Sequence, residues 1–122
     1  MLKGIDPAIN ADVMHALMQM GHGDTLVLCD INHPAQTIAR QTTYGQLLNI
    51  SGCGLPQAAA AILTLFPLDT FVDAPVKRMQ VVGAPETHLP IFSDIQAVID
   101  TAEGRPVAME ALERFAFYDA AK

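Results

Sequence analysis

The N-terminal part of the chain has the hydrophobic periodicity of an amphipathic helix. Between Asn10 and Gly21, apolar residues recur at helical spacing while the opposite face is polar. Asn10 is favoured at a helix N-cap, and Gly21 suits the position just past a helix end. The pattern predicts a helix between them with an apolar stripe that packs into the core. This stripe consists of Val13, Met14, Leu17 and Met18.

A continuous apolar run of strand length follows at residues 25–29, bounded by Asp24 and Asp30. Such a run is typical of an interior strand that is covered on both faces. Cys29, the last residue of the run, is therefore expected to be a small buried core residue. The sequence predicts a central strand at this point.

Helical and strand patterns alternate along the rest of the chain. They predict a helix over 55–66 with Pro56 in its first turn, a strand at 79–82, and a helix from Ser93 to Gly104. Residues 107–111 fit a strand, and a helix follows from Glu113. Residues 33–46 and 83–90 are loops by composition. The alternation favours a single α/β/α domain over residues 1–122, with a central sheet flanked by helices.

Composition and charge exclude several classes of partner. Hydrophobic residues make up 51% and charged residues 16% of the 122 residues, which is apolar for a soluble monomer and favours self-association. The net charge is −6 and the basic residues form no stripe, so nucleic acid is not an expected partner. The longest apolar run, 58–66, is too short to span a membrane, and Asp6 and Pro7 interrupt any signal peptide. We expect a cytoplasmic protein.

Polar side chains that could bind a ligand or transfer a proton lie at both ends of the apolar run. Asp30 follows it directly, where ligands bind in open α/β sheets, and His22 precedes it. A histidine exchanges protons near neutral pH, and an aspartate accepts hydrogen bonds from hydroxyl groups. The same residues also fit a plain turn, in which Gly21 and Gly23 end the helix and Asp24 closes an Asx turn.

A metal centre is a further alternative for this region. Histidine nitrogens and carboxylate oxygens can share a metal ion, but no recognised ligand spacing supports one here. We expect no metal and no other cofactor. The possible ligands would be His22, Asp24, Asp30 and His33.

Several motifs resemble those of a known family. The stretches MLKGIDP, MGHGDTLVLCD, HPAQ, LTLFPLDTFVDAPVKRM and ERFAFYD occur in order through residues 1–118. They are similar to the family of L-fucose mutarotases and D-ribose pyranases (RbsD/FucU), and more so to its fucose branch. The resemblance implies an isomerase that interconverts the α and β anomers of a monosaccharide, most simply L-fucose, without a cofactor.

The resemblance also implies roles for individual residues. His22 matches the family's catalytic histidine, and Asp30 and Arg114 match sugar-binding positions. Tyr118 lies one helical turn beyond Arg114 and is a further candidate for substrate binding. Family members form homo-oligomers, often rings paired into decamers, whose active sites are completed by a neighbouring subunit.

Two departures from the family pattern affect these expectations. Family members continue through a Tyr-Gly/Ala-Asn motif that contacts the sugar, whereas this chain stops at Lys122, so we expect it to be part of a longer protein. His33 stands where fucose-type sequences often have an aromatic residue, and we interpret it as a loop residue facing solvent. The alternative function is a sugar-binding or transport-associated protein that does not catalyse the exchange.

Overall fold

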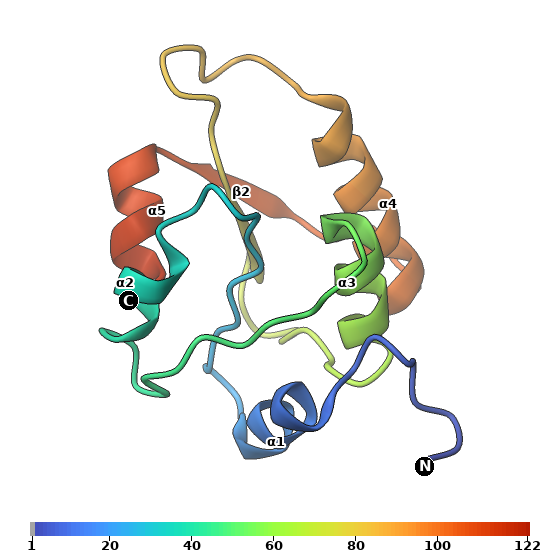
Figure 1. Cartoon of the computed structure of the whole chain (residues 1–122). Coiled ribbons are helices and arrows are strands. Elements are labelled where there is room, and N and C mark those ends of the chain that lie inside the picture. The colour runs from blue at the N-terminus through green and yellow to red at the C-terminus, as the bar shows by residue number, and fades with distance from the viewer. Residues whose placement is uncertain (1) are drawn as a thin grey trace.

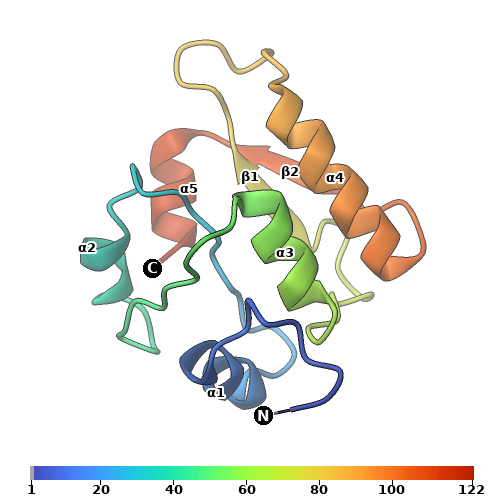
Figure 2. The same cartoon turned by 45° about the vertical axis from the view of Figure 1, so that its right-hand side comes forward.

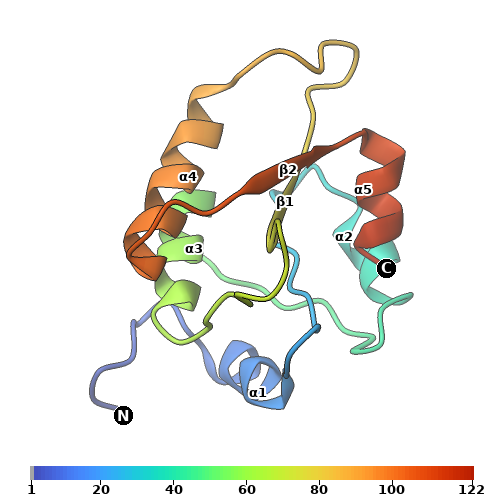
Figure 3. The same ribbon diagram turned by 180° about the vertical axis from the view of Figure 1, so that it is seen from behind.

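The computed structural model describes residues 2–122 and confirms the α/β fold class. Helices lie on both sides of a small sheet, with α3 and α4 on one side and α2 and α5 on the other (Figure 1), as the view from behind also shows (Figure 3). The elements are α1 (Ala11–Gln19), α2 (Ala35–Ala39), α3 (Leu55–Leu63), β1 (Val76–Met79), α4 (Pro90–Glu103), β2 (Met109–Leu112) and α5 (Arg114–Ala120).

The sheet consists of β1 and β2, which pair in parallel across the α4 connection. Val76 stands opposite Met109, and Met79 stands opposite Leu112. The first strand lies three residues earlier than the predicted 79–82. It ends early because a turn follows, in which the Ala84 N–H donates to the Val81 carbonyl. The strand predicted at 107–111 is present as β2, two residues later at its start.

The first helix has the predicted N-cap, but one of the residues predicted to face the core is exposed. The Asn10 side chain accepts a hydrogen bond from the Val13 N–H at 3.0 Å. Val13 is buried, as is Ala16, and Met14 and Leu17 pack against the core. Met18 is 80% exposed, so its expected place in the core was wrong. Five residues beyond Val13, its side chain points away from the buried face.

Residues 24–30 are not the interior strand that the sequence predicts. The segment runs without a turn or bend, but it does not form a strand of the sheet. Leu26 and Leu28 pack against the core around Ile62, while Val27 between them is exposed. Only one face is therefore covered, as in a half-buried strand. Cys29 is half-buried rather than buried, and its partial burial, followed by the charge of Asp30, raises the pKa of its thiol.

The helices α3 and α4 pack side by side, as Figure 2 shows. Pro56 occupies the first turn of α3 as predicted, but the helix ends at Leu63 because the Thr64 hydroxyl caps the Ala61 carbonyl. The fourth helix begins at Pro90, before the predicted Ser93 cap, and ends at Glu103, with Gly104 just past its end at φ +68° as predicted. Among residues 2–122, no helix has the length and apolar content of a membrane span.

One segment expected to be a loop contains a helix. Residues 35–39 form α2, although their composition indicated only loop structure. Ile38 and Ala39 are buried, so tertiary packing rather than local propensity stabilises this short helix. α2 lies beside α5 (Figure 1), and His33 in the turn that precedes α2 packs against Tyr118.

Candidate active site

A tight turn after α1 presents His22 to solvent. The Asp24 N–H donates to the Gly21 carbonyl at 3.1 Å, and the Asp24 carboxylate accepts the Gly21 N–H at 2.8 Å. Gly23 has φ +84°, a conformation that favours glycine. We call residues 21–24 the His22 turn. A turn is present, but the Asp24 carboxylate bonds to a residue before it rather than forming the expected Asx turn. Gly21 has no positive φ, and Met20 in an extended conformation ends the helix instead.

Asp69 holds the His22 turn from a distant part of the sequence. Its Oδ1 lies 2.6 Å from His22 Nδ1, and its Oδ2 accepts the Gly23 N–H at 3.0 Å. The imidazole also contacts the ring of Phe71 edge to face, with 5.3 Å between centroids. The hydrogen bond from His22, followed by that from Gly23, lowers the pKa of the Asp69 carboxyl. The His22 side chain remains 83% exposed.

Asp30 begins a second turn at the other end of the extended segment. Its Oδ1 accepts the Asn32 N–H at 2.9 Å, and its carbonyl accepts the His33 N–H at 3.2 Å. The turn leads directly into α2. Because Asp30 is exposed, its carboxylate can accept further hydrogen bonds from a ligand.

His33 is not the solvent-facing loop residue that we expected. Its ring packs edge to face against Phe117 and Tyr118 of α5, with centroids 6.0 and 5.3 Å apart. Its Nε2 is buried and has no hydrogen-bond partner among residues 2–122. Partial burial lowers the pKa of His33, against the opposing effect of Asp30. His33 therefore connects the Asp30 turn to α5.

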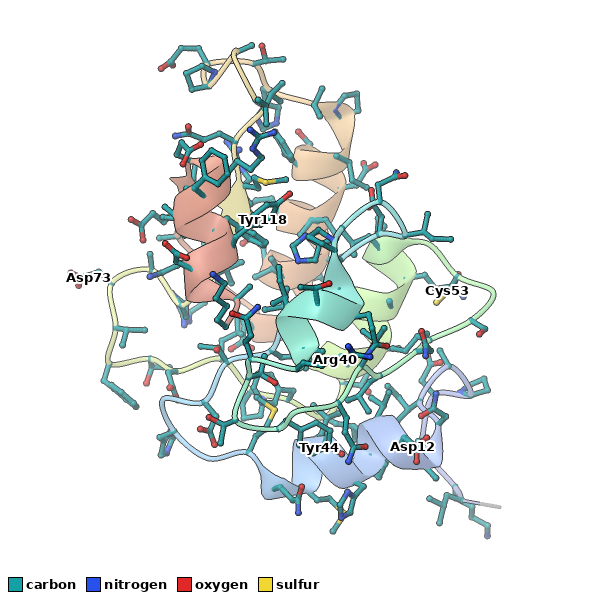
Figure 4. The ribbon with its side chains drawn as sticks, turned by 60° about the vertical axis from the view of Figure 1, so that its left-hand side comes forward. Asp12, Arg40, Tyr44, Cys53, Asp73 and Tyr118 are labelled. Atoms are coloured by element: carbon teal, nitrogen blue, oxygen red, sulfur yellow. The ribbon has the colours of Figure 1, made fainter. Side chains whose placement is uncertain are left out.

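Arg114 and Tyr118 lie one helical turn apart on α5. The Glu113 carboxylate caps this helix by accepting the Phe115 N–H at 2.8 Å, which places Arg114 at its first position. The Arg114 guanidinium lies over the Phe115 ring, and its Nε is buried with no partner in the described chain. Tyr118 lies on the side of α5 that faces the rest of the fold (Figure 4). The α5 cluster consists of Asp30, His33, Arg114 and Tyr118.

The His22 turn and the α5 cluster are separate within one copy of the chain. They lie at opposite ends of residues 24–30, which run without a turn or bend from the α1 side toward α2 (Figures 1 and 3). Six residue steps of extended chain span roughly 20 Å. The structure therefore connects the Asp30 turn to Tyr118 through His33, but it does not bring His22 to them.

The residues considered as metal ligands are divided in the same way. His22 and Asp24 belong to the His22 turn, whereas Asp30 and His33 belong to the α5 cluster. Within residues 2–122, no group of three or more histidine, cysteine or acidic side chains is arranged to hold a metal ion.

Replacing His33 by phenylalanine is expected to stabilise the protein by about 1 kcal/mol, because it removes a buried nitrogen without a partner. The substitution also removes a loss of stability that we expect of the wild type at acid pH. Since the folded state lowers the pKa of His33 from 6.5, the unfolded state binds a proton first, and the wild type loses stability as the pH falls below that value. Thermal unfolding between pH 5 and 8 measures both effects.

The matched control for this prediction is His88→Phe. His88 is exposed, and its Nε2 lies 2.7 Å from the Ser93 hydroxyl, so the substitution removes a satisfied nitrogen. We expect no gain in stability from it. A lower Tm for His33→Phe than for the wild type would contradict the account of His33.

The structure is that of a small α/β protein. Its candidate ligand-binding side chains lie at both ends of one extended segment. The RbsD / FucU transport protein family matches residues 3–122. L-fucose mutarotase of Actinobacillus pleuropneumoniae serotype 5b is 38% identical over 122 residues, which cover 100% of this chain and 81% of the relative. The chain belongs to the RbsD/FucU family.

Solved structures agree with this assignment. The crystal structure of protein Atu2016 has a TM-score of 0.92 and 52% identity, and the match covers 99% of this chain and 80% of that one. The fucose mutarotase from Streptococcus pneumoniae, solved in complex with L-fucose, has a TM-score of 0.85 and 32% identity over 98% of this chain and 81% of its own. The similarity extends over nearly the whole chain.

Proposed function

We propose that the protein interconverts the α and β anomers of L-fucose or a closely related monosaccharide. The observation that carries the proposal is the exposed His22 imidazole, held at Nδ1 by Asp69 with Nε2 free of any hydrogen bond in residues 2–122. It stands in the motif through which the chain resembles sugar mutarotases, and the A. pleuropneumoniae relative is named L-fucose mutarotase. The chemistry needs only a group that accepts and returns a proton.

The proposed reaction opens and recloses the sugar ring. His22 Nε2 removes the proton of the anomeric hydroxyl, and the resulting imidazolium donates it to the ring oxygen as the bond from C1 to that oxygen breaks. Rotation about C1–C2 presents the other face of the aldehyde, and the reverse steps close the ring. Acid/base assistance of this kind contributes roughly 10²–10⁴-fold to a rate. No covalent intermediate with the enzyme forms.

Three side chains of the α5 cluster are proposed to hold the sugar. The Asp30 carboxylate accepts hydrogen bonds from hydroxyl groups, the Arg114 guanidinium donates them, and the Tyr118 hydroxyl can do both. Their spacing is supported by the helical turn between Arg114 and Tyr118 and by His33, which joins Tyr118 to the Asp30 turn. They orient the ring and leave proton transfer to His22.

The proposed active site requires two copies of the chain, because His22 lies away from the α5 cluster of its own copy. Exposed apolar side chains support such contacts at both ends. Phe71 and Val72 follow Asp69 beside the His22 turn, while Ile31 and Phe115 flank the α5 cluster. A contact between two different surfaces repeats from copy to copy, and it forms a ring when the rotation between copies closes. We therefore propose a homo-oligomeric ring, with the paired rings of a decamer as the form that the family resemblance implies.

Polarimetry tests the proposed activity. Freshly dissolved α-L-fucose changes its optical rotation as the anomers equilibrate, and the proposal predicts that catalytic amounts of the protein accelerate this relaxation. Binding of L-fucose in calorimetry without acceleration would instead establish a sugar-binding or transport-associated protein. The same assay with D-ribose shows whether the protein accelerates the equilibration of L-fucose more than that of D-ribose, as the resemblance to the fucose branch predicts.

A further inference from the structure

Among the described residues, only Asp69 forms a hydrogen bond with a nitrogen of the His22 imidazole, and Asp69 lies 47 residues later in the sequence. We infer that Asp69 is a positioning residue, which holds His22 with its proton on Nδ1 so that Nε2 faces solvent as the base. The inference rests on the proposed function for its catalytic consequence. Its structural part, the position of the proton, holds independently of the substrate.

The carboxylate of Asp69 fixes the ring and the backbone of the His22 turn together. Oδ1 meets the imidazole at 2.6 Å, and Oδ2 accepts the Gly23 N–H at 3.0 Å. The side chain of Asp69 is only 22% exposed, and the Phe71 ring, two residues further along the same segment, also contacts the imidazole. Both the direction and the tilt of the imidazole are therefore determined by residues 69–71.

The two carboxylates near His22 have different partners. Asp24 bonds to the Gly21 N–H and closes the turn, without contact to the imidazole. Asp69 alone bonds to Nδ1. Loss of Asp24 is thus expected to loosen the turn, whereas loss of Asp69 changes the imidazole itself.

The chemistry of the pair determines which nitrogen is the base. An ionised carboxylate only accepts hydrogen bonds, so the nitrogen that meets Asp69 must carry a proton in neutral His22. The lone pair is then on Nε2, which points outward. When Nε2 takes a second proton during ring opening, the negative charge of Asp69 stabilises the imidazolium. The lowered pKa of Asp69 favours its ionised form.

Imidazole nitrogen NMR tests the inference through Asp69→Asn. Long-range proton–nitrogen spectra of protein labelled at histidine distinguish the two neutral forms. The wild type is expected to carry the His22 proton on Nδ1. In the variant, the amide can donate to Nδ1, and the proton is expected to move to Nε2. With the base blocked, kcat for anomer exchange should fall on the order of 100-fold, with a much smaller change in KM.

Asp73→Asn is the matched control. It removes the same charge four residues further along, where Asp73 points away from the fold (Figure 4) and forms no ion pair among the described residues. We expect its His22 spectrum and its kcat to match those of the wild type.

Two results would overturn the inference. A wild-type spectrum with the His22 proton on Nε2 would do so without any variant, and so would an Asp69→Asn protein that keeps both the Nδ1 proton and the full kcat. If Asp69→Asn does not fold, the wild-type spectrum still decides. If the wild type lacks anomer exchange, the proposed function fails while the spectra continue to test the role of Asp69.

Discussion

Replacing His22 by alanine is expected to lower the rate of anomer exchange by roughly 10²–10⁴-fold, the usual contribution of a single acid/base group. The imidazole is removed from an exposed turn whose backbone is held by Asp24 and by the Gly23 contact to Asp69, so folding should be little affected. Saturation transfer between the anomeric protons of L-fucose measures the rate. Calorimetry with the same sugar should show that binding persists.

The control for this prediction is His15→Ala. His15 is an exposed histidine on α1, and its only hydrogen-bond partner in the described chain is the Tyr44 hydroxyl at 3.5 Å. Its loss should leave the exchange rate unchanged. Equal rates for His22→Ala and the wild type would show that another group transfers the proton.

Mixing two inactive variants is expected to restore activity. If His22 of one copy works with Arg114 of the next, a ring assembled from His22→Ala and Arg114→Ala chains contains some sites with both residues intact. For random assembly of equal amounts, about a quarter of the sites are complete. Co-expression with two different tags and purification through both yields such mixed rings, whose kcat per site is compared with that of the wild type.

The matched control is a ring in which one chain carries both substitutions and the other is wild type. Random assembly again leaves about a quarter of the sites complete, so this ring and the mixed ring should have the same activity. A mixed ring as inactive as each variant alone would show that His22 and Arg114 act within one copy. That result would contradict the proposed division of the active site between copies.

Local signals in the sequence predicted where helices begin and end better than they predicted the strands of the sheet. The Asn10 cap, Pro56 in the first turn of α3 and the left-handed Gly104 are all present, because each depends on a few neighbouring residues. The strand expected at 25–29 depends on partners elsewhere in the fold and is unpaired here. The helix α2 was missed because burial of Ile38 and Ala39, rather than local propensity, stabilises it.

The candidate site shows the same limit. His22 and Asp30 stand out because they flank an apolar run, and the resemblance to the family pointed to Arg114. Asp69 gave no signal of its own, since a contact across 47 residues leaves no local spacing to read. Asp69 lies within the stretch at 63–79 that resembles the family, but that resemblance did not single it out. His33 was misjudged because a loop position does not reveal the aromatic rings of α5 that cover it.

Proton NMR exchange spectroscopy on equilibrated L-fucose tests the central claim most directly. The spectrum follows magnetisation between the α and β anomeric protons while the overall composition stays constant. Cross-peaks that appear with the wild-type protein at substoichiometric concentration, and that grow with its concentration, are the predicted result. A folded protein that binds L-fucose but produces no cross-peaks beyond those of the sugar alone would contradict the assignment as a mutarotase.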